Sequence, residues 1–236
     1  MKKLSKEKKK RYRQYGILAG GISAAVLFII SIVIGVSHLL KPVDIQPVSG
    51  SAVPVYETAS VEKPAVKKAF LTKNVNSRPG TPLEQVRGAV VHYTANPGTD
   101  AMANRNYFES RKDCEDAARN KVSSHYIIGL DGTIVQCIPE KEIAYASNER
   151  NEDTISIECC HPNKSGKFSE ATYKALIQLL AYLCAKYDFG TDSIIRHYDV
   201  TGKPCPKYYV KHEGAWEKIK QEAYDYLIKN GKKEQG

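Results

Sequence analysis

Three residues with metal-binding side chains dominate the chemistry that this sequence could perform. His197 ends an apolar, strand-like run, and Cys205 follows eight residues later, after a turn rich in Gly and Pro. His92 ends another apolar run about a hundred residues upstream. Each alone would more often be a hydrogen-bonded strand-end His or a buried thiol. Together they are good ligands for Zn²⁺, and three protein ligands leave a fourth position open, which is typical of a catalytic zinc site.

Two charged residues could act beside such a metal. Glu158 lies within the apolar run 154–160, where alternation separates it from the face carrying Ile155 and Ile157. One interpretation is an edge strand with Glu158 in water; the other is a buried base near the metal, with its pKa raised by burial. Lys203 precedes Cys205 by two residues and is either a solvated surface charge or a group that stabilises a substrate oxyanion.

The elements that must position these residues follow from hydrophobic periodicity. Both His residues end apolar strands, and the carboxyl ends of strands are where α/β sheets place their sites. Asp131 and Gly132 between two β-rich runs predict a hairpin, Ser169 predicts a helix N-cap, and Gly190 predicts the stop of that helix. Strands interleaved with helices predict a single α/β domain with a mixed central sheet flanked by helices. The predicted strands are residues 89–94, 124–130, 133–138, 154–160 and 192–197, and the predicted helices are 100–120, 169–188 and 213–230.

The N-terminal part of the chain predicts a membrane anchor. The first 13 residues carry a net charge of +7, which leaves only +2 of the formal +9 for the rest and argues against a nucleic-acid partner. Residues 14–40 contain no charged side chain, and their apolar core is longer than that of a secretory signal peptide, the rival interpretation. We expect a cytoplasmic tail (1–15), a single transmembrane helix (16–40), a Pro-rich linker (41–68) and an extracytoplasmic domain (69–236). The protein would then span the cell membrane once, with its N-terminus on the cytoplasmic side.

The six cysteines all follow this apolar segment. An oxidising exterior permits disulfides, but their spacing is irregular and no connectivity can be read from it. Besides the candidate ligand Cys205, they are either paired or buried free thiols that pack as small apolar groups. They are Cys114, Cys137, Cys159, Cys160 and Cys184.

Four segments together resemble the zinc-dependent N-acetylmuramoyl-L-alanine amidases of the type-2 class, relatives of phage lysozyme-type amidases and of peptidoglycan recognition proteins. The resemblance covers roughly residues 86–227. It is carried by Val-Val-His-Tyr-Thr at 90–94, His-Tyr-Ile-Ile-x-x-Asp-Gly-Thr at 125–133, Ser-Ile-Glu at 156–158, and Arg-His at 196–197 with Lys-x-Cys-Pro at 203–206.

The resemblance implies Zn²⁺ bound by His92, His197 and Cys205, with Glu158 as catalytic acid/base and Lys203 as an auxiliary. It implies hydrolysis of the amide between N-acetylmuramic acid and L-alanine in peptidoglycan. We expect the domain outside the membrane to be monomeric. Cys205 stands where many cytoplasmic relatives use Asp.

Three questions stay open at the level of sequence. Some phage-type members carry a catalytic Tyr where this chain has Ser124, and Glu158 could take over that role. Ser124 and His125 are neighbours in a strand and face opposite ways, so only one can line a cleft, and His125 is otherwise a core residue. The alternatives to a zinc hydrolase are a non-catalytic peptidoglycan-binding module of the same fold and a Cys/His enzyme with Cys205 or Cys159 as nucleophile.

Overall fold

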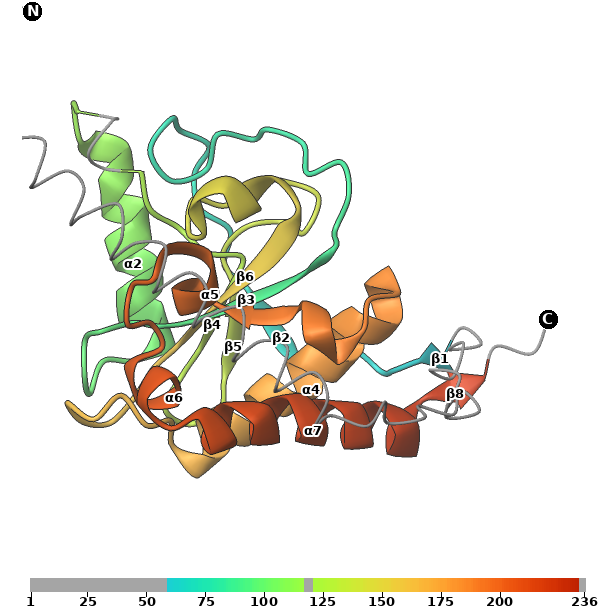
Figure 1. Cartoon of the computed structure of the whole chain (residues 1–236). Helices are drawn as coiled ribbons and strands as arrows, with labels where there is room; N and C mark the ends of the chain where they lie inside the picture. Colours follow the sequence, from blue (N-terminus) through green and yellow to red (C-terminus); the bar gives the residue numbers. More distant parts are fainter. Residues whose placement is uncertain (1–58, 117–120, 234–236) are drawn as a thin grey trace, which may run out of the picture. The chain divides into compact units, whose positions relative to one another are not determined.

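The structure, a computed structural model, describes residues 59–116 and 121–233 (Figure 1). A six-stranded sheet forms the centre of the domain, in the order β2-β5-β4-β6-β3-β7. All neighbours are parallel except the hairpin pair β4 and β5, so the predicted mixed sheet is confirmed. The strands are β2 (Val66–Lys68), β3 (Gly88–Tyr93), β4 (Tyr126–Ile128), β5 (Ile134–Gln136), β6 (Thr154–Cys159) and β7 (Ile194–Arg196).

Helices cover both faces of this sheet (Figure 1). On one face, α4 (Glu170–Tyr187) packs against the strands and α7 (Glu213–Asn230) packs against α4. On the other face, α2 (Ala101–Ser110) contacts β4 and β5 and is followed by the 3₁₀ helix η1 (Arg111–Asp113). The hydrophobic core is therefore divided in two, one part under α4 and α7 and a smaller one under α2.

Strand alternation decides which side chains reach which core. Ile155, Ile157 and Cys159 of β6 pack in the larger core beneath α4, as the alternation predicted. Their neighbours on β6 therefore point to the α2 side, where Cys160 joins the smaller core just after the strand ends. Parallel pairing of β3 with β6 places His92 opposite Glu158, so both side chains are on the α2 side of the sheet.

The last predicted strand is shorter than expected. Residues 192–197 were expected to form one strand, but the 3₁₀ helix η3 (Thr191–Ser193) comes first and His197 is the first residue of helix α5 (His197–Thr201). The Asp199 carboxylate accepts a hydrogen bond from the backbone N–H of Arg196 at 2.8 Å, which caps α5. His197 therefore projects from a helix N-terminus rather than from a strand.

Other boundaries differ for local reasons. Helix α2 ends at Ser110, well before the expected residue 120, and residues 117–120 lie outside the described part. Helix α4 begins after its predicted N-cap Ser169 and ends at Tyr187, close to its predicted end. The residue that caps it is Asp188, with a φ of 52°, rather than the predicted stop Gly190. Helix α7 begins and ends as predicted and is preceded by α6 (Lys207–Lys211).

Two short strands lie inside the segment expected to be a linker. Strand β2 forms an edge of the central sheet, and β1 (Ala59–Ser60) pairs with β8 (Lys232–Lys233) near the end of the chain. Backbone pairing with β5 gives β2 a partner that its polar side chains did not reveal. Within the described residues, every helix is too short or too polar to cross a membrane; the predicted anchor at 16–40 lies outside them.

Candidate metal centre

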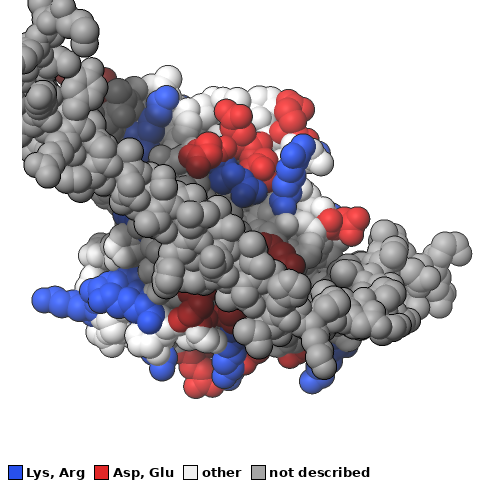
Figure 2. Space-filling model, viewed as in Figure 1, with Lys and Arg blue, Asp and Glu red and all other residues white. Residues whose placement is uncertain are grey.

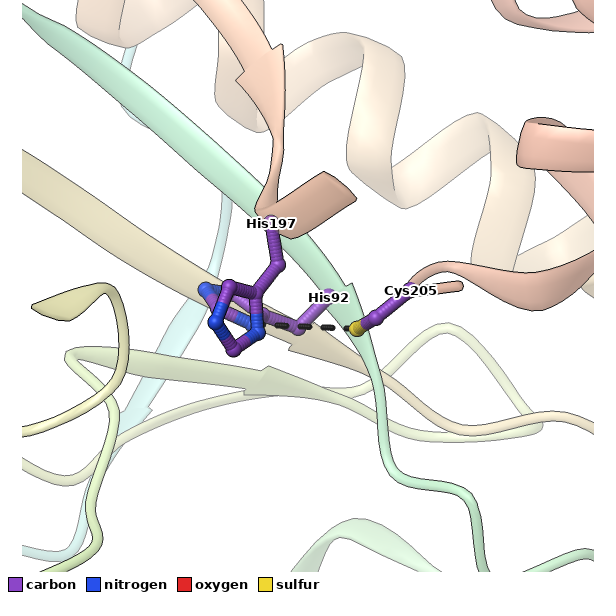
Figure 3. Close-up of side chains that lie close together, drawn as sticks. All are labelled: His92, His197 and Cys205. Atoms are coloured by element: carbon purple, nitrogen blue, oxygen red, sulfur yellow. Dashed lines mark hydrogen bonds between the residues drawn. The ribbon is translucent and has the colours of Figure 1, made fainter. Parts of the chain in front are cut away.

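Two imidazoles and a thiol from three separate elements converge at one end of the sheet (Figure 3). His92 comes from β3, His197 opens α5, and Cys205 lies in the loop between α5 and α6. One ligand atom from each lies within 4.8 Å of the others, and all three side chains are buried. Cys205 Sγ is 3.8 Å from His92 Nδ1, and the two imidazole rings are 4.7 Å apart between centroids.

This donor set fits a zinc ion. Zn–N distances of about 2.0–2.1 Å and a Zn–S distance of about 2.3 Å place N and S roughly 3.6 Å apart in a tetrahedral site, close to the observed separation. Burial and the neighbouring His197 and Lys203 hold the pKa of His92 well below its usual range, so this imidazole is neutral and has a lone pair to donate. Burial raises the pKa of the Cys205 thiol to about 12, so a bound cation is needed to ionise it.

Glu158 lies beside this cluster on the neighbouring strand. It is the cross-strand partner of His92, and its Oε2 atom is buried without a hydrogen-bond partner. Burial raises the pKa of Glu158 to about 8, while the Lys203 ammonium acts in the opposite direction. A carboxyl group with a pKa near neutrality can both accept and return a proton, as general acid–base catalysis requires.

Lys203 supplies a positive charge to the same cleft. Its charge lowers the pKa values of His92 and of His197, in each case after the larger effect of burial. The backbone around it is held by hydrogen bonds from Cys205 N–H to the Lys203 carbonyl and from Lys203 N–H to Thr201 Oγ1. Lys203, two residues before Cys205 in sequence, therefore lines the same cleft as Cys205.

A cleft of about 300 Å³ contains these residues and extends towards α2. Tyr107 and Phe108 of α2 and Tyr145 of the loop before β6 line it, and half of the Tyr107 side chain is exposed. None of Tyr107, Phe108 and Tyr145 was predicted from the sequence to line a site. Their place in the cleft depends on the crossing of α2 over the sheet, which no local pattern reports.

Ser147 and Asn148 were also missed. Ser147 Oγ lies 3.0 Å from His92 Nε2, and Asn148 Oδ1 lies 3.3 Å from His197 Nε2. The signal in the sequence was only a polar stretch bounding β6, which is typical of an ordinary loop.

Ser124 and His125 do not reach the cleft. Ser124 is fully buried and donates a hydrogen bond to the carbonyl of Ser156 or Tyr126, both at 2.9 Å. His125 Nδ1 accepts from Ser156 N–H at 3.0 Å, so its Nε2–H donates to the carbonyl of Glu142 at 2.8 Å. Burial lowers the pKa of His125 to about 4, as expected of a neutral core histidine.

All six cysteines are free thiols, which resolves the pairing that the sequence left open. Cys159 points into the core beneath α4, away from the cleft, and burial raises its pKa well above the usual range. Helix α6 begins two residues after Cys205. The raised pKa values of Cys159 and Cys205 argue against a thiolate nucleophile at either residue.

Comparisons with known proteins agree with this geometry. N-acetylmuramoyl-L-alanine amidase CwlL of Bacillus licheniformis is 37% identical over 157 residues, which is 61% of this chain and 42% of that protein. N-acetylmuramoyl-L-alanine amidase BlyA of Bacillus subtilis (strain 168) is 30% identical over 165 residues, with the same coverage of both chains. This chain spans less than half the length of these curated relatives.

Solved structures share the fold. The catalytic domain of XlyA is 26% identical, with a TM-score of 0.55, and the match covers 68% of this chain and 99% of that one. PlyL, at 23% identity and a TM-score of 0.58, covers 68% of this chain and 97% of its own, and supports the fold alone. Residues 82–208, more than half of the chain, match the family described as N-acetylmuramoyl-L-alanine amidase and contain all three converging residues together with Glu158 and Lys203. The protein is therefore a member of this family, the type-2 amidases.

Proposed function

We propose that this domain is a zinc-dependent hydrolase that cleaves the amide between N-acetylmuramic acid and L-alanine in peptidoglycan. The observation that carries the proposal is the convergence of His92, His197 and Cys205 in one cleft with Glu158, whose buried Oε2 has no hydrogen-bond partner. Family membership and the names of the curated relatives support the same reaction. A zinc ion held by the three converging side chains would supply Lewis acidity, which makes water nucleophilic at neutral pH and polarises the scissile carbonyl.

The protein's own residues divide the proton chemistry and the charge between them. Glu158 removes a proton from the water that attacks the carbonyl carbon, because its raised pKa matches the operating pH. Lys203 stabilises the negative charge that develops on the carbonyl oxygen. Glu158 then returns the proton to the leaving amine of L-alanine, so no other acid is needed.

The cleft walls indicate how the substrate is held. Tyr107, Phe108 and Tyr145 present aromatic surfaces next to the reacting groups, and aromatic side chains bury large apolar areas while Tyr hydroxyls can still bond polar groups. On the face shown in Figure 2, Lys and Arg side chains alternate with Asp and Glu among the described residues. Such a mixture of both signs differs from the basic patch expected of a surface that binds nucleic acid.

The experiment is a wall-release assay with the purified full chain in mild detergent. We expect release of peptide stems bearing a new L-alanine amino terminus from purified peptidoglycan, and loss of release after chelation and in Cys205→Ala. Binding to the wall without any release would instead identify a non-catalytic recognition module. Undiminished release after chelation would refute the zinc mechanism.

We also propose that the chain is anchored in the cell membrane by residues 16–40, with residues 1–15 in the cytoplasm and a monomeric catalytic domain outside. The support is the charge-free apolar segment that directly follows a basic tail. Such a topology gives the domain access to peptidoglycan. Protease treatment of intact spheroplasts tests it: removal of the domain is expected, and full protection would contradict the orientation.

A further inference from the structure

One short turn contacts both imidazoles of the metal centre. The turn comprises Ser147 and the 3₁₀ helix η2 (Asn148–Glu152), directly before β6. Its first two residues place side-chain oxygens at 3.0 Å from His92 Nε2 and 3.3 Å from His197 Nε2. Ser147 is fully buried and His92 nearly so. Two consecutive residues thus reach two histidines that are about a hundred positions apart in sequence.

The turn is fixed by its own hydrogen bonds. Asn151 Oδ1 accepts from Ala146 N–H at 2.9 Å and from Ser147 N–H at 2.6 Å. The Ser147 carbonyl accepts from Arg150 N–H at 3.0 Å, and the Arg150 side chain is paired with Asp153 at 2.7 Å. The backbone that carries the Ser147 hydroxyl and the side-chain carbonyl of Asn148 is therefore held in place before any ligand binds.

The acceptors restrict which imidazole nitrogen carries the proton. A neutral imidazole has one N–H, and the side-chain carbonyl of Asn148 can only accept, so His197 Nε2 must be the donor. The Ser147 hydroxyl can accept from His92 Nε2–H or donate to a bare Nε2, and it accepts when Nδ1 of His92 is the nitrogen that binds a metal. Each ring is then left with a lone pair on Nδ1, and His92 Nδ1 is the nitrogen that faces Cys205 Sγ.

We propose that Ser147 and Asn148 are positioning residues that hold His92 and His197 with Nε2 turned towards them and favour the Nε2–H tautomer, so that both present Nδ1 to the metal. The inference rests on the metal site of the proposed function. Hydrogen bonds to the outer nitrogen of a metal-binding His fix its orientation and its basicity, and their loss typically lowers metal affinity about 10–100-fold.

The backbone of Asn148 permits a clean test of its side chain. Its φ of 52° lies in the left-handed region, which Gly and Asn tolerate better than other residues. Asn148→Gly keeps the backbone conformation and removes the acceptor. Asn148→Asp keeps an acceptor oxygen at the same position. At Ser147, Ala removes the hydroxyl and Thr retains it.

The experiment combines two measurements on the full chain. The first is ¹⁵N NMR of the imidazoles in metal-free protein, where we expect Nε2–H tautomers for His92 and His197 in the wild type and mixed tautomers in Ser147→Ala and Asn148→Gly, respectively. The second is Zn²⁺ affinity by competition with a chelator, where we expect a 10–100-fold loss in these two variants and near wild-type affinity in Ser147→Thr and Asn148→Asp.

Internal controls separate positioning from general damage. His125 takes its tautomer from Ser156 N–H and the Glu142 carbonyl, so its signals are expected to stay unchanged in every variant. Ser165→Ala removes an exposed hydroxyl that bonds only within its own turn and is expected to leave both measurements at wild-type values.

Two results are distinguishable. Wild-type tautomers and zinc affinity within about twofold in both Ser147→Ala and Asn148→Gly would overturn the positioning role. Failure of the wild-type protein to bind zinc would overturn the proposed function, whereas the tautomers of the metal-free protein would still decide whether Ser147 and Asn148 set them.

Discussion

Replacement of Glu158 by Gln should strongly reduce the rate of catalysis while stabilising the metal-free protein. Gln preserves the size of the side chain but cannot accept a proton from water. Loss of a general base typically lowers the rate about 10²–10⁴-fold. The free energy of unfolding should instead increase in the variant, because the folded state disfavours the ionised carboxylate, whose Oε2 is buried without a hydrogen-bond partner.

The magnitude follows from the pKa shift. Burial raises the pKa of Glu158 from 4.5 to about 8. An acid whose pKa is raised on folding contributes its full stability below pH 4.5 and loses it as the pH rises towards 8. Above pH 4.5 the carboxyl group ionises in the unfolded state but stays protonated in the folded state until about pH 8. The free energy of unfolding therefore falls by about 1.4 kcal/mol per pH unit, or by about 3 kcal/mol at pH 7. Water in the cleft screens part of this, so roughly 2–3 kcal/mol is expected.

The assay is urea unfolding of chelator-treated wild type and Glu158→Gln between pH 4.5 and 8. The two proteins should have equal stability near pH 4.5, and the variant should gain steadily as the pH rises. Glu152→Gln, which changes an exposed carboxylate in the preceding turn, is the matched control and should follow the wild type. A difference between wild type and Glu158→Gln that does not change with pH would refute the burial argument.

Three further perturbations test other parts of the structure. Cys205→Ala should lower zinc binding measured by metal analysis to background and remove the increase in melting temperature that zinc gives the wild type; a zinc-loaded variant would contradict the ligand assignment. Gly88→Ala should destabilise the fold by roughly 1–3 kcal/mol in urea unfolding, because a Cβ would lie 2.4 Å from the Ser193 carbonyl oxygen; an unchanged midpoint would argue against this close approach. Glu140→Gln should destabilise the protein by roughly 1–3 kcal/mol at pH 7. Burial alone would raise the pKa of Glu140, but hydrogen bonds from Lys186 and two tyrosines lower it overall. The stabilisation is therefore present above the pKa of the unfolded state and is lost as the pH falls through the pKa of the folded state. A destabilisation by Glu140→Gln that persists unchanged to about pH 3 would argue against this explanation.

Local patterns determined most of the elements. The period of α7, the Ser169 N-cap and the Asp-Gly hairpin depend on interactions within a few residues, and the structure has each where the sequence predicted it. Alternation along β6 correctly separated Glu158 from the core face, because side chains in a strand must alternate whatever lies beyond it.

One error lies where a distant partner decides the local conformation, and two lie at helix ends that residues close in sequence decide. Strand β2 looks like a linker until β5 supplies its hydrogen bonds. His197 looked like the end of a strand, but the carboxylate of Asp199 caps a helix at that point. Asp188 ends α4 in a conformation that only a few residue types adopt, and the nearby Gly190 gave the stronger signal.

The sequence by itself determined the chemistry available to the protein: two imidazoles, a thiol, a carboxylate and an ammonium in recognisable surroundings. Only the tertiary structure decided that ligand atoms of the two imidazoles and the thiol lie within 4.8 Å of one another and that Glu158 lies opposite His92. It also decided that Ser147 and Asn148 contact the Nε2 atoms of the two rings. The physical reason is that residue types and periodicities are local properties, whereas strand register and helix crossing are set by packing between segments far apart along the chain.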